Sequence, residues 1–281
     1  MASTVTGIDA TALDSLLEKV HRDTGYDFRE YKRGTVTRRL ERRLHATGVR
    51  TYLDYVEFLD AHPGEYQRLA DDLIIKVSGF FRSPYTFQQV ARVVLPELTL
   101  FKRDRGEREL RFWSTACARG EEPYSIAILL AGFLGNQRQD FDISICATDI
   151  SRQALQEVRA GVYSLEVDGL TPTVLKSYFT RYDKGYVVNS DIRQMVRFSY
   201  YDLTSTTRQP FVNLDCIFCC NVLIYLQSQL QERVLSMLYD SLATPGYLIL
   251  GEVETPTNSL RDKLECLDAR AKIYKKNKGR R

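Results

Sequence analysis

Segments that favour strands alternate with segments that favour helices between residues 109 and 251, and this alternation limits the possible folds more than any other feature. The expected strands are Glu109–Trp113, Asp142–Thr148, Asp215–Cys219 and Tyr247–Gly251, and the expected helices are Glu122–Leu134, Ser151–Ala160 and Ser228–Leu242. Such alternation predicts parallel βαβ units and therefore an α/β fold. Between them, Tyr186–Asn189 and Met195–Tyr200 are predicted to be antiparallel strands that form either a small β insertion at about residues 178–200 or a sheet edge.

The residues before about position 80 show helical periodicity without strand-like alternation. The segment Ala12–Thr24 places its leucines and Val20 at helical spacing. Further helices are expected at Thr35–Ala46, Tyr52–Leu59 and Glu65–Val77, with one or two more in Pro84–Asp104. The sequence therefore predicts a small all-helical domain over residues 1–80 and an α/β domain over residues 81–281.

Composition excludes several classes of protein. The chain has 281 residues, of which 44% are hydrophobic and 27% are charged, as in ordinary folded domains. The longest apolar stretches, Ile126–Leu134 and Cys216–Leu226, are shorter than the roughly 18–20 residues of a membrane helix, and residues 1–10 do not look like a secretory signal. Six cysteines, four of which lie in apolar runs, predict reduced thiols, with neither a disulfide framework nor a metal site. We therefore expect a cytoplasmic protein that does not insert into membranes.

Positive charge is concentrated in one segment. Eight basic and two acidic residues lie between Arg29 and Arg50, although the net charge of the whole chain is only +3. Four of the basic residues surround the apolar stripe of the helix expected at residues 35–46, namely Arg38, Arg39, Arg42 and Arg43. This pattern favours an anionic partner, with a merely solvated helix face as the alternative.

The loop after the first α/β strand, residues 114–122, consists mostly of small residues, so a ligand can approach its backbone at the carboxyl end of the strand. The loop contains neither GxGxxG nor a P-loop, which disfavours dinucleotide and triphosphate binding. Asp149 ends the next strand, where a carboxylate can accept the hydroxyl groups of a ribose. Alone, the loop could be an ordinary turn and Asp149 a helix cap, but together they favour an adenosine-containing cofactor.

Four motifs give the chain a resemblance to a known family. They are Val77-Ser78-Gly79-Phe80-Phe81-Arg82, Gly120-Glu121-Glu122-Pro123-Tyr124-Ser125, Ala147-Thr148-Asp149-Ile150-Ser151 and Ile217-Phe218-Cys219-Cys220-Asn221-Val222-Leu223-Ile224-Tyr225. In this order they resemble the chemotaxis receptor methyltransferases, the CheR family, from about residue 10 to residue 275. The resemblance implies a Rossmann-like class I methyltransferase domain with a small antiparallel β-subdomain, preceded by an all-helical domain. It also implies that S-adenosyl-L-methionine methylates glutamate side chains of bacterial chemoreceptors, leaving S-adenosyl-L-homocysteine.

The resemblance implies roles for individual residues. The implied cofactor contacts are Ser78, Arg82, Glu122, Asp149, Asp202, Leu203 and Asn221. Arg82 and Tyr225 would lie beside the reacting methyl group. The basic helix would face the anionic cytoplasmic helices of methyl-accepting chemotaxis receptors, and we expect a monomer.

The chemistry of such a site can be predicted from its side chains. A glutamate with a pKa of about 4.3 is already a nucleophile at pH 7, so the reaction needs positioning and no general base. Arg82 can hold a carboxylate through paired hydrogen bonds in one plane. Phe80, Phe81 and Tyr225 are expected to form an apolar wall that excludes water.

The sequence departs from the usual family pattern at Ser78, Arg119, Cys220 and Glu252. A second hypothesis is therefore a degenerate CheR-like module that binds cofactor and regulates without methylating receptors. A third, a nucleic-acid methyltransferase, is disfavoured because Asn221-Val222-Leu223-Ile224 lacks the Asn-Pro-Pro-aromatic element of base-amino methyltransferases. We therefore expect no nucleic-acid partner.

Overall fold

The computed structural model describes residues 10–205 and 209–276, which form two compact units. The first unit contains the described residues up to Ile75 together with Tyr225–Leu230. The second unit contains Lys76–Ile224 and the described residues from Gln231 onward. Among the described residues, no helix combines the length and the apolar character that crossing a membrane requires.

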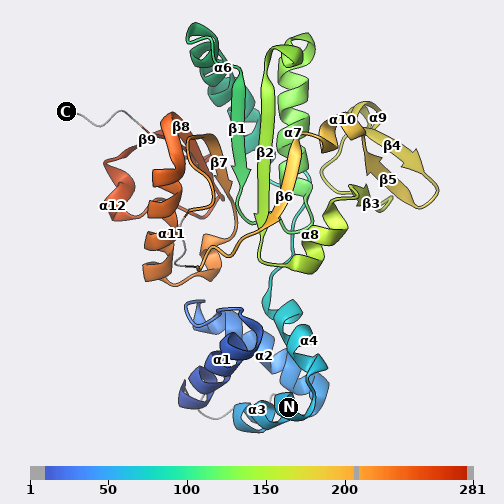
Figure 1. Cartoon of the computed structure of the whole chain (residues 1–281), viewed down its shortest axis with the longest axis vertical. Coiled ribbons are helices and arrows are strands. Elements are labelled where there is room, and N and C mark those ends of the chain that lie inside the picture. Colours follow the sequence, from blue (N-terminus) through green and yellow to red (C-terminus); the bar gives the residue numbers. More distant parts are fainter. Residues whose placement is uncertain (1–9, 206–208, 277–281) are drawn as a thin grey trace. The chain divides into compact units, whose positions relative to one another are not determined.

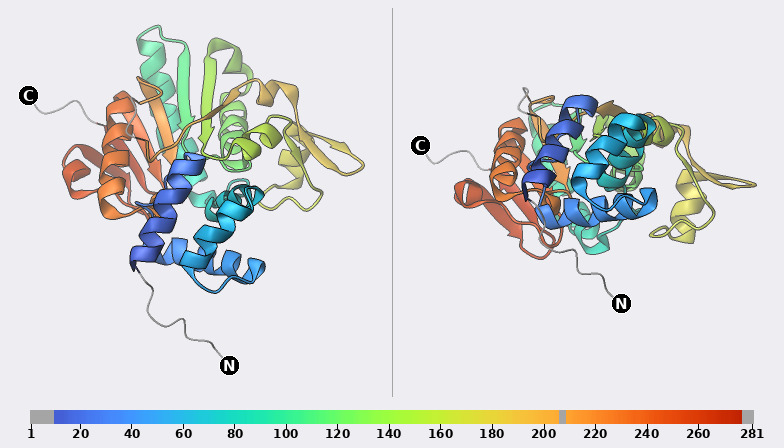
Figure 2. Two further views of the ribbon diagram at one scale, coloured as in Figure 1. Left: turned by 60° about the horizontal axis from the view of Figure 1, so that its bottom comes forward. Right: turned by 90° about the horizontal axis from the view of Figure 1, so that it is seen from below.

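Four helices make up most of the first unit (blue to cyan in Figure 2): α1 (Ala10–Thr24), α2 (Arg33–Thr47), α3 (Tyr52–Ala61) and α4 (Gly64–Leu73). Helix α1 packs against α3, and α2 packs against α4. The apolar stripes predicted from the sequence form the core, where Leu16, Val20 and Leu40 are fully buried. Helix α4 ends four residues before the predicted end, because Ile74 takes an extended conformation.

The segment Tyr225–Leu230 joins the first unit through backbone pairing. Tyr31 and Leu226 form an antiparallel bridge, and the Lys32 N–H donates to the Tyr225 carbonyl at 2.7 Å. The Gln227 side-chain amide donates to the carbonyl of Tyr31 at 3.0 Å. These bonds attach a segment from late in the chain to the turn that precedes α2.

A seven-stranded main sheet forms the centre of the second unit in the described part of the chain (Figure 1), with strand order β6-β2-β1-β7-β8-β10-β9. Its strands are β1 (Glu109–Ser114), β2 (Asp142–Asp149), β6 (Val196–Tyr200), β7 (Leu214–Cys219), β8 (Leu242–Leu250), β9 (Leu264–Asp268) and β10 (Ile273–Lys276). The first five of these strands pair in parallel, whereas β10 runs antiparallel to both β8 and β9. The predicted α/β fold is therefore confirmed.

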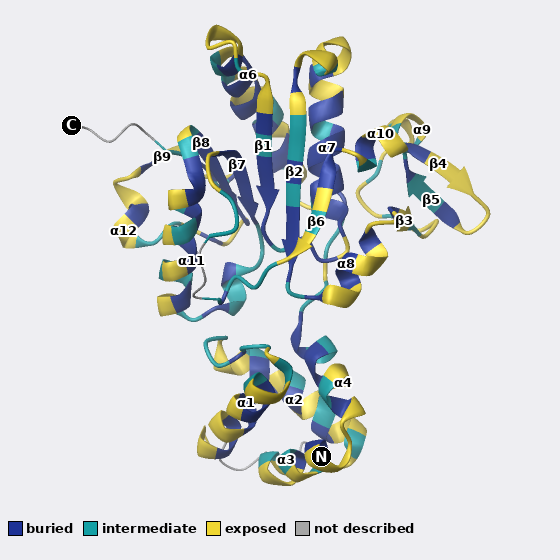
Figure 3. Ribbon diagram, in the orientation of Figure 1, coloured by how far each residue is buried: buried dark blue, intermediate teal, exposed yellow. Residues whose placement is uncertain are grey.

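Strands β1, β7 and β8 of this sheet are mostly buried (dark blue in Figure 3), and helices lie between and beside the strands along the chain from Pro84 onward. These helices are α5 (Pro84–Gln89), the π-helical η1 (Val90–Val94), α6 (Leu95–Asp104), α7 (Glu121–Leu134), the 3-10 helix η2 (Gly135–Asp140), α8 (Arg152–Val158), α9 (Pro172–Tyr178), α10 (Ser190–Arg193), the 3-10 helix η3 (Leu223–Tyr225), α11 (Ser228–Ser241) and α12 (Asn258–Arg261). Ser151 is the N-cap of α8, as predicted, because its hydroxyl accepts the Ala154 N–H at 3.2 Å.

A small antiparallel sheet lies beside the β6 edge of the main sheet (Figure 1), in the order β3-β5-β4. Its strands are β3 (Val162–Tyr163), β4 (Phe179–Tyr182) and β5 (Gly185–Val188). The predicted strand at 186–189 is thus β5. A strand at a sheet edge is also found within Met195–Tyr200, but its predicted antiparallel pairing is wrong. Those residues form β6, which pairs in parallel with β2 as the edge of the main sheet, with Ile145 opposite Val196.

The first unit also contains a buried ion pair between α2 and α4. Glu65 has a side chain only 2% exposed, and its Oε1 accepts two hydrogen bonds from the Arg43 guanidinium, at 2.6 and 2.9 Å. The Tyr55 hydroxyl donates to the same oxygen at 2.8 Å. Removing one partner of such a pair leaves the other charge buried without compensation.

We predict that Arg43→Met lowers the free energy of unfolding by about 3 kcal/mol, because the buried Glu65 loses its nearest cation and keeps only the exposed Arg68, 3.8 Å from its other oxygen. Urea unfolding followed by circular dichroism measures this change. Arg38→Met is the matched control, since Arg38 is an exposed arginine on the same helix. Equal stability of the two variants would contradict the buried role of Arg43.

Candidate active site

The carboxyl ends of β1, β2, β6 and β7 carry most of the predicted cofactor residues. The loop after β1 is fixed by two backbone bonds, from Thr115 N–H to the Phe218 carbonyl at 3.0 Å and from Cys117 N–H to the Thr148 carbonyl at 2.9 Å. It then turns through positive φ angles at Ala118 (46°) and Gly120 (85°) before α7 begins. A Cβ at position 120 would also lie 3.1 Å from Val158 and from the Tyr163 hydroxyl, so glycine is required there.

Asp149 ends β2 beside this loop. Its side chain is buried, with Oδ2 accepting the Ala118 N–H and Oδ1 accepting the Ser151 N–H, both at 2.8 Å. Burial raises the pKa of Asp149 above its usual value, and the two N–H groups oppose that rise. The carboxylate thus both orders the loop and fixes Ser151, the N-cap residue of α8, while each oxygen keeps lone pairs for a ribose hydroxyl.

Glu122 lies in the first turn of α7, partly buried, with Ser114 at the end of β1 donating to its Oε1 at 2.6 Å. Burial raises the pKa of Glu122 to about 7. The negative charge of Glu254 adds to the rise, while hydrogen bonds from Ser114 and Cys220 and the positive charge of Arg82 oppose it. The site therefore contains a carboxyl group that titrates near neutral pH.

The segment before α5 carries Ser78 and Arg82. The Ser78 hydroxyl bonds the buried carboxylate of Glu121, whose pKa is raised by burial. Arg82 is exposed, and its Nη1 donates to the Val77 carbonyl at 3.1 Å. It follows Phe81, which has a positive φ of 46° and whose N–H donates to the Ser125 hydroxyl at 2.9 Å. A bond between α7 and this turn therefore fixes the backbone just before Arg82.

The two phenylalanines of this segment have different surroundings. Phe80 is 1% exposed and packs edge-on against Tyr163 and Phe179, with ring centroids 4.8 and 5.5 Å apart. Phe81 is partly buried and contacts Phe87. Phe80 therefore joins the small sheet to the core and does not form the predicted apolar wall.

Asp202 and Leu203 follow β6 at the same edge of the sheet. The Tyr201 N–H donates to the Asp149 carbonyl at 3.2 Å, which ties this segment to the end of β2. Asp202 Oδ1 accepts from the N–H and the hydroxyl of Thr204, at 2.8 and 2.7 Å, and Leu203 is partly exposed.

Asn221 follows β7 with a positive φ of 59°. Its N–H donates to Glu254 Oε2 at 2.9 Å, and Glu254 is a residue that the sequence prediction did not include. The sequence feature that could have pointed to Glu254 is a charged residue three positions after Gly251, just beyond the end of a buried strand. Tyr225 belongs to the first unit, where its carbonyl accepts the Lys32 N–H.

The four arginines predicted to bind a receptor differ in their environment. Arg43 is engaged with Glu65, as described above. Arg42 Nη2 bonds Asp72 Oδ1 at 2.7 Å with a side chain 60% exposed, and Arg39 donates to the Asp72 carbonyl. Arg38 is exposed. Acidic residues of α4 thus neutralise part of the basic helix, and Arg38 and Arg42 remain the most accessible cations of the set.

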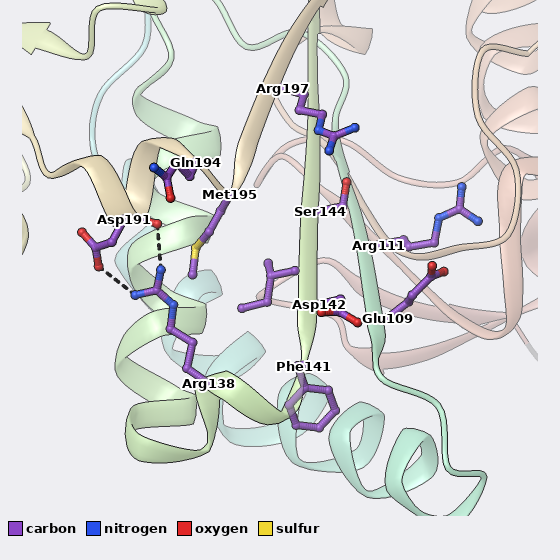
Figure 4. A pocket seen from close by; sticks show the side chains of 11 residues that line it. Glu109, Arg111, Arg138, Phe141, Asp142, Ser144, Asp191, Gln194, Met195 and Arg197 are labelled. Atoms are coloured by element: carbon purple, nitrogen blue, oxygen red, sulfur yellow. Dashed lines mark hydrogen bonds and ion pairs between the residues drawn. The ribbon is translucent and has the colours of Figure 1, made fainter.

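A polar groove of about 640 Å³ lies elsewhere on the main sheet, over the amino-terminal halves of β1, β2 and β6 (Figure 4). Arg111, Ser144 and Arg197 line it, and at one side Arg138 is held by Asp191 through a 2.8 Å ion pair. The groove contains none of the predicted site residues. The candidate active site is therefore the carboxyl edge of the sheet, where ligands bind in folds of this kind.

The strand order and the loops at this edge define a Rossmann-like class I methyltransferase domain. Residues 76–273 match the family model described as the CheR methyltransferase SAM-binding domain, and residues 11–74 match that of the CheR methyltransferase all-alpha domain. The chain belongs to the CheR methyltransferase family, and its cofactor is S-adenosylmethionine.

Curated relatives agree with this assignment. The chain is 34% identical to chemotaxis protein methyltransferase 2 of Pseudomonas aeruginosa, over 84% of each protein. It is 30% identical to the chemotaxis protein methyltransferase of Borreliella burgdorferi, over 86% of this chain and 87% of that protein. An uncharacterized 104.1 kDa protein of Rhodobacter capsulatus is 32% identical over 94% of this chain, which spans only 27% of that protein.

The raised pKa of Glu122 has a consequence for stability. Between its ordinary pKa of 4.5 and about 7, the folded protein retains a proton that the unfolded chain has lost. This residue's contribution to the free energy of unfolding therefore falls as pH rises through that window.

We compare the free energy of unfolding of the wild type with that of Glu122→Gln. We predict that the wild-type value minus the variant value falls by up to about 3 kcal/mol between pH 4.5 and 7.5. Urea unfolding of both proteins across this pH range gives the difference. A difference that is independent of pH would show that Glu122 titrates at its ordinary value.

Proposed function

We propose that this protein transfers the methyl group of S-adenosylmethionine to glutamate side-chain carboxylates on cytoplasmic helices of bacterial chemoreceptors. The observation that carries the proposal is the ordered match of both CheR family domains, over residues 11–74 and 76–273. The names of the P. aeruginosa and B. burgdorferi relatives support a role in chemotaxis. The proposed activity places the protein in the cytoplasm, where receptor helices are accessible.

The residues at the carboxyl edge of the main sheet fit this cofactor. When bound, S-adenosylmethionine supplies an electrophilic methyl group on a sulfonium cation. Asp149, Asp202 and Leu203 lie at the ends of neighbouring strands, where a ribose and its base would be held. Ser78, Glu122 and Asn221 supply polar groups around the adjacent β1 and β7 ends, and the ionised form of the partly buried Glu122 would complement a cationic ligand.

The chain's own contribution to the reaction is positioning. A substrate glutamate is ionised at neutral pH, so no residue has to remove a proton from it. In this proposal Arg82 orients the carboxylate through its guanidinium, and Tyr225 completes the wall beside the methyl group. The exposed guanidinium of Arg82 is anchored at one nitrogen by the Val77 carbonyl, which leaves its other donors for an anion.

The direct experiment incubates the protein with labelled S-adenosylmethionine and receptor-containing membranes, followed by a test for base-labile methyl ester. Labelled receptor with base-labile methanol release is the expected result. Absence of ester from a protein that binds S-adenosylhomocysteine in calorimetry would favour the regulatory-module hypothesis instead.

Arg82→Lys is predicted to lower kcat at least about 100-fold, because lysine keeps the charge but not the planar pair of donors. This loss corresponds to roughly 3 kcal/mol of transition-state stabilisation. The methylation assay gives kcat, and the thermal unfolding midpoint checks that the variant is folded. Unchanged turnover in a folded Arg82→Lys protein would remove Arg82 from the reaction centre.

We propose that the accessible cations of the basic helix, Arg38 and Arg42, contact the receptor. Reversing Arg38 and Arg42 to Glu is predicted to raise KM for receptor membranes and to flatten its salt dependence, since exposed charges steer association and are screened over about 8–10 Å. Arg22→Glu with Arg50→Glu is the matched control, because these residues are exposed cations of the same unit outside the predicted set. The same KM in both double variants would leave α2 as a solvated helix face.

A further inference from the structure

Glu254 is a buried acidic residue just beyond the end of β8. It is 4% exposed, and its carboxylate accepts three backbone hydrogen bonds. Oε2 accepts the N–H of Gly251 at 2.7 Å and that of Asn221 at 2.9 Å, and Oε1 accepts the N–H of Ile224 at 3.2 Å. One side chain thus joins the loops that follow β7 and β8.

The position of Glu254 is unusual for a charged side chain. None of the ion pairs among the described residues includes it. Burying a carboxylate is costly unless hydrogen bonds replace its hydration, and here three N–H donors do so. Backbone amides, rather than a cation, therefore determine where this carboxylate lies.

The backbone that receives these bonds has little freedom. Asn221 has a left-handed φ of 59°, a conformation that few residues besides glycine and asparagine adopt readily. A Cβ at Gly251 would lie 2.6 Å from Glu254 Oε2 and 2.8 Å from the Asn221 nitrogen. The two loops therefore approach too closely for a larger residue, and Glu254 supplies the acceptors between them.

We propose that Glu254 is a positioning residue of the cofactor site, which holds residues 221–224 so that the Asn221 side chain faces the ligand. This inference rests on the proposed function, in which Asn221 contacts S-adenosylmethionine. Glu254 itself would touch neither cofactor nor substrate. It would affect the reaction only by fixing the conformation of the loop after β7.

Glutamine cannot replace this carboxylate. Its amide has the same shape but exchanges one acceptor oxygen for an NH₂ donor, and that donor would face a backbone N–H. If the remaining oxygen occupies the Oε2 position, the amide nitrogen occupies the Oε1 position. The hydrogen bond from the Ile224 N–H is then lost, and this N–H faces the NH₂ group, which is also a donor. Glu254→Gln therefore loosens the loop without emptying the space that the side chain fills.

We expect Glu254→Gln to weaken S-adenosylhomocysteine binding about tenfold in calorimetry. Glu252→Gln is the matched control, because Glu252 is an exposed glutamate two residues away, and it should bind as the wild type does. Circular dichroism confirms that both variants are folded. If Glu254→Gln does not fold, Glu254→Asp keeps the charge with a shorter reach and should show the same direction of change.

A double-mutant cycle separates positioning from general destabilisation. Asn221→Gly removes the side chain, and glycine tolerates the positive φ at this position. In the Asn221→Gly protein, adding Glu254→Gln should weaken S-adenosylhomocysteine binding by less than about a further twofold, because both changes act on the same contact. Additive losses, or unchanged affinity in Glu254→Gln, would overturn the positioning role. Failure of the wild type to bind S-adenosylhomocysteine would overturn the proposed function first, and the inference with it.

Discussion

The candidate site depends on two backbone hydrogen bonds that extend the main sheet into the loop after β1. They join Thr115 to Phe218 in β7 and Cys117 to Thr148 in β2, so the loop is held by both neighbouring strands. Because it is fixed at these points, the chain can reverse at Ala118 and begin α7 with its acidic residues near the same edge. The Ala118 N–H then meets the Asp149 carboxylate. These hydrogen bonds together position the loop after β1, the start of α7 and the Asp149 carboxylate.

Much of the fold was predictable because its signals are local. Buried parallel strands such as β7 are continuous apolar runs, and the small-residue loop and Asp149 follow directly from strand ends. The pairing of β6 was predicted wrongly because Val196–Tyr200 alternates apolar and polar residues, as the edge strand of either sheet would. Only its pairing with β2 decides between them, and that pairing joins residues about fifty positions apart.

The site was less predictable than the fold, because the environment of a side chain depends on distant partners. Arg43 looked like one of four equivalent cations until Glu65, twenty-two residues later, proved to bury it in an ion pair. Phe80 looked like a wall of the site, but Tyr163 and Phe179 enclose it. Glu254 was not predicted as a site residue, because its role depends on hydrogen bonds from the amides of Asn221 and Ile224.

The pairing of Tyr225–Leu230 with the first unit means that the chain passes between the two units three times. The helices up to Ile75 consequently do not form a complete structural unit without residues 225–230. An evolutionary exchange or a designed chimera that replaced only those helices would break the Tyr31–Leu226 bridge and the Gln227 bonds. A successful exchange has to carry residues 225–230 with it, so the two parts of this protein are expected to change together and not as separable modules.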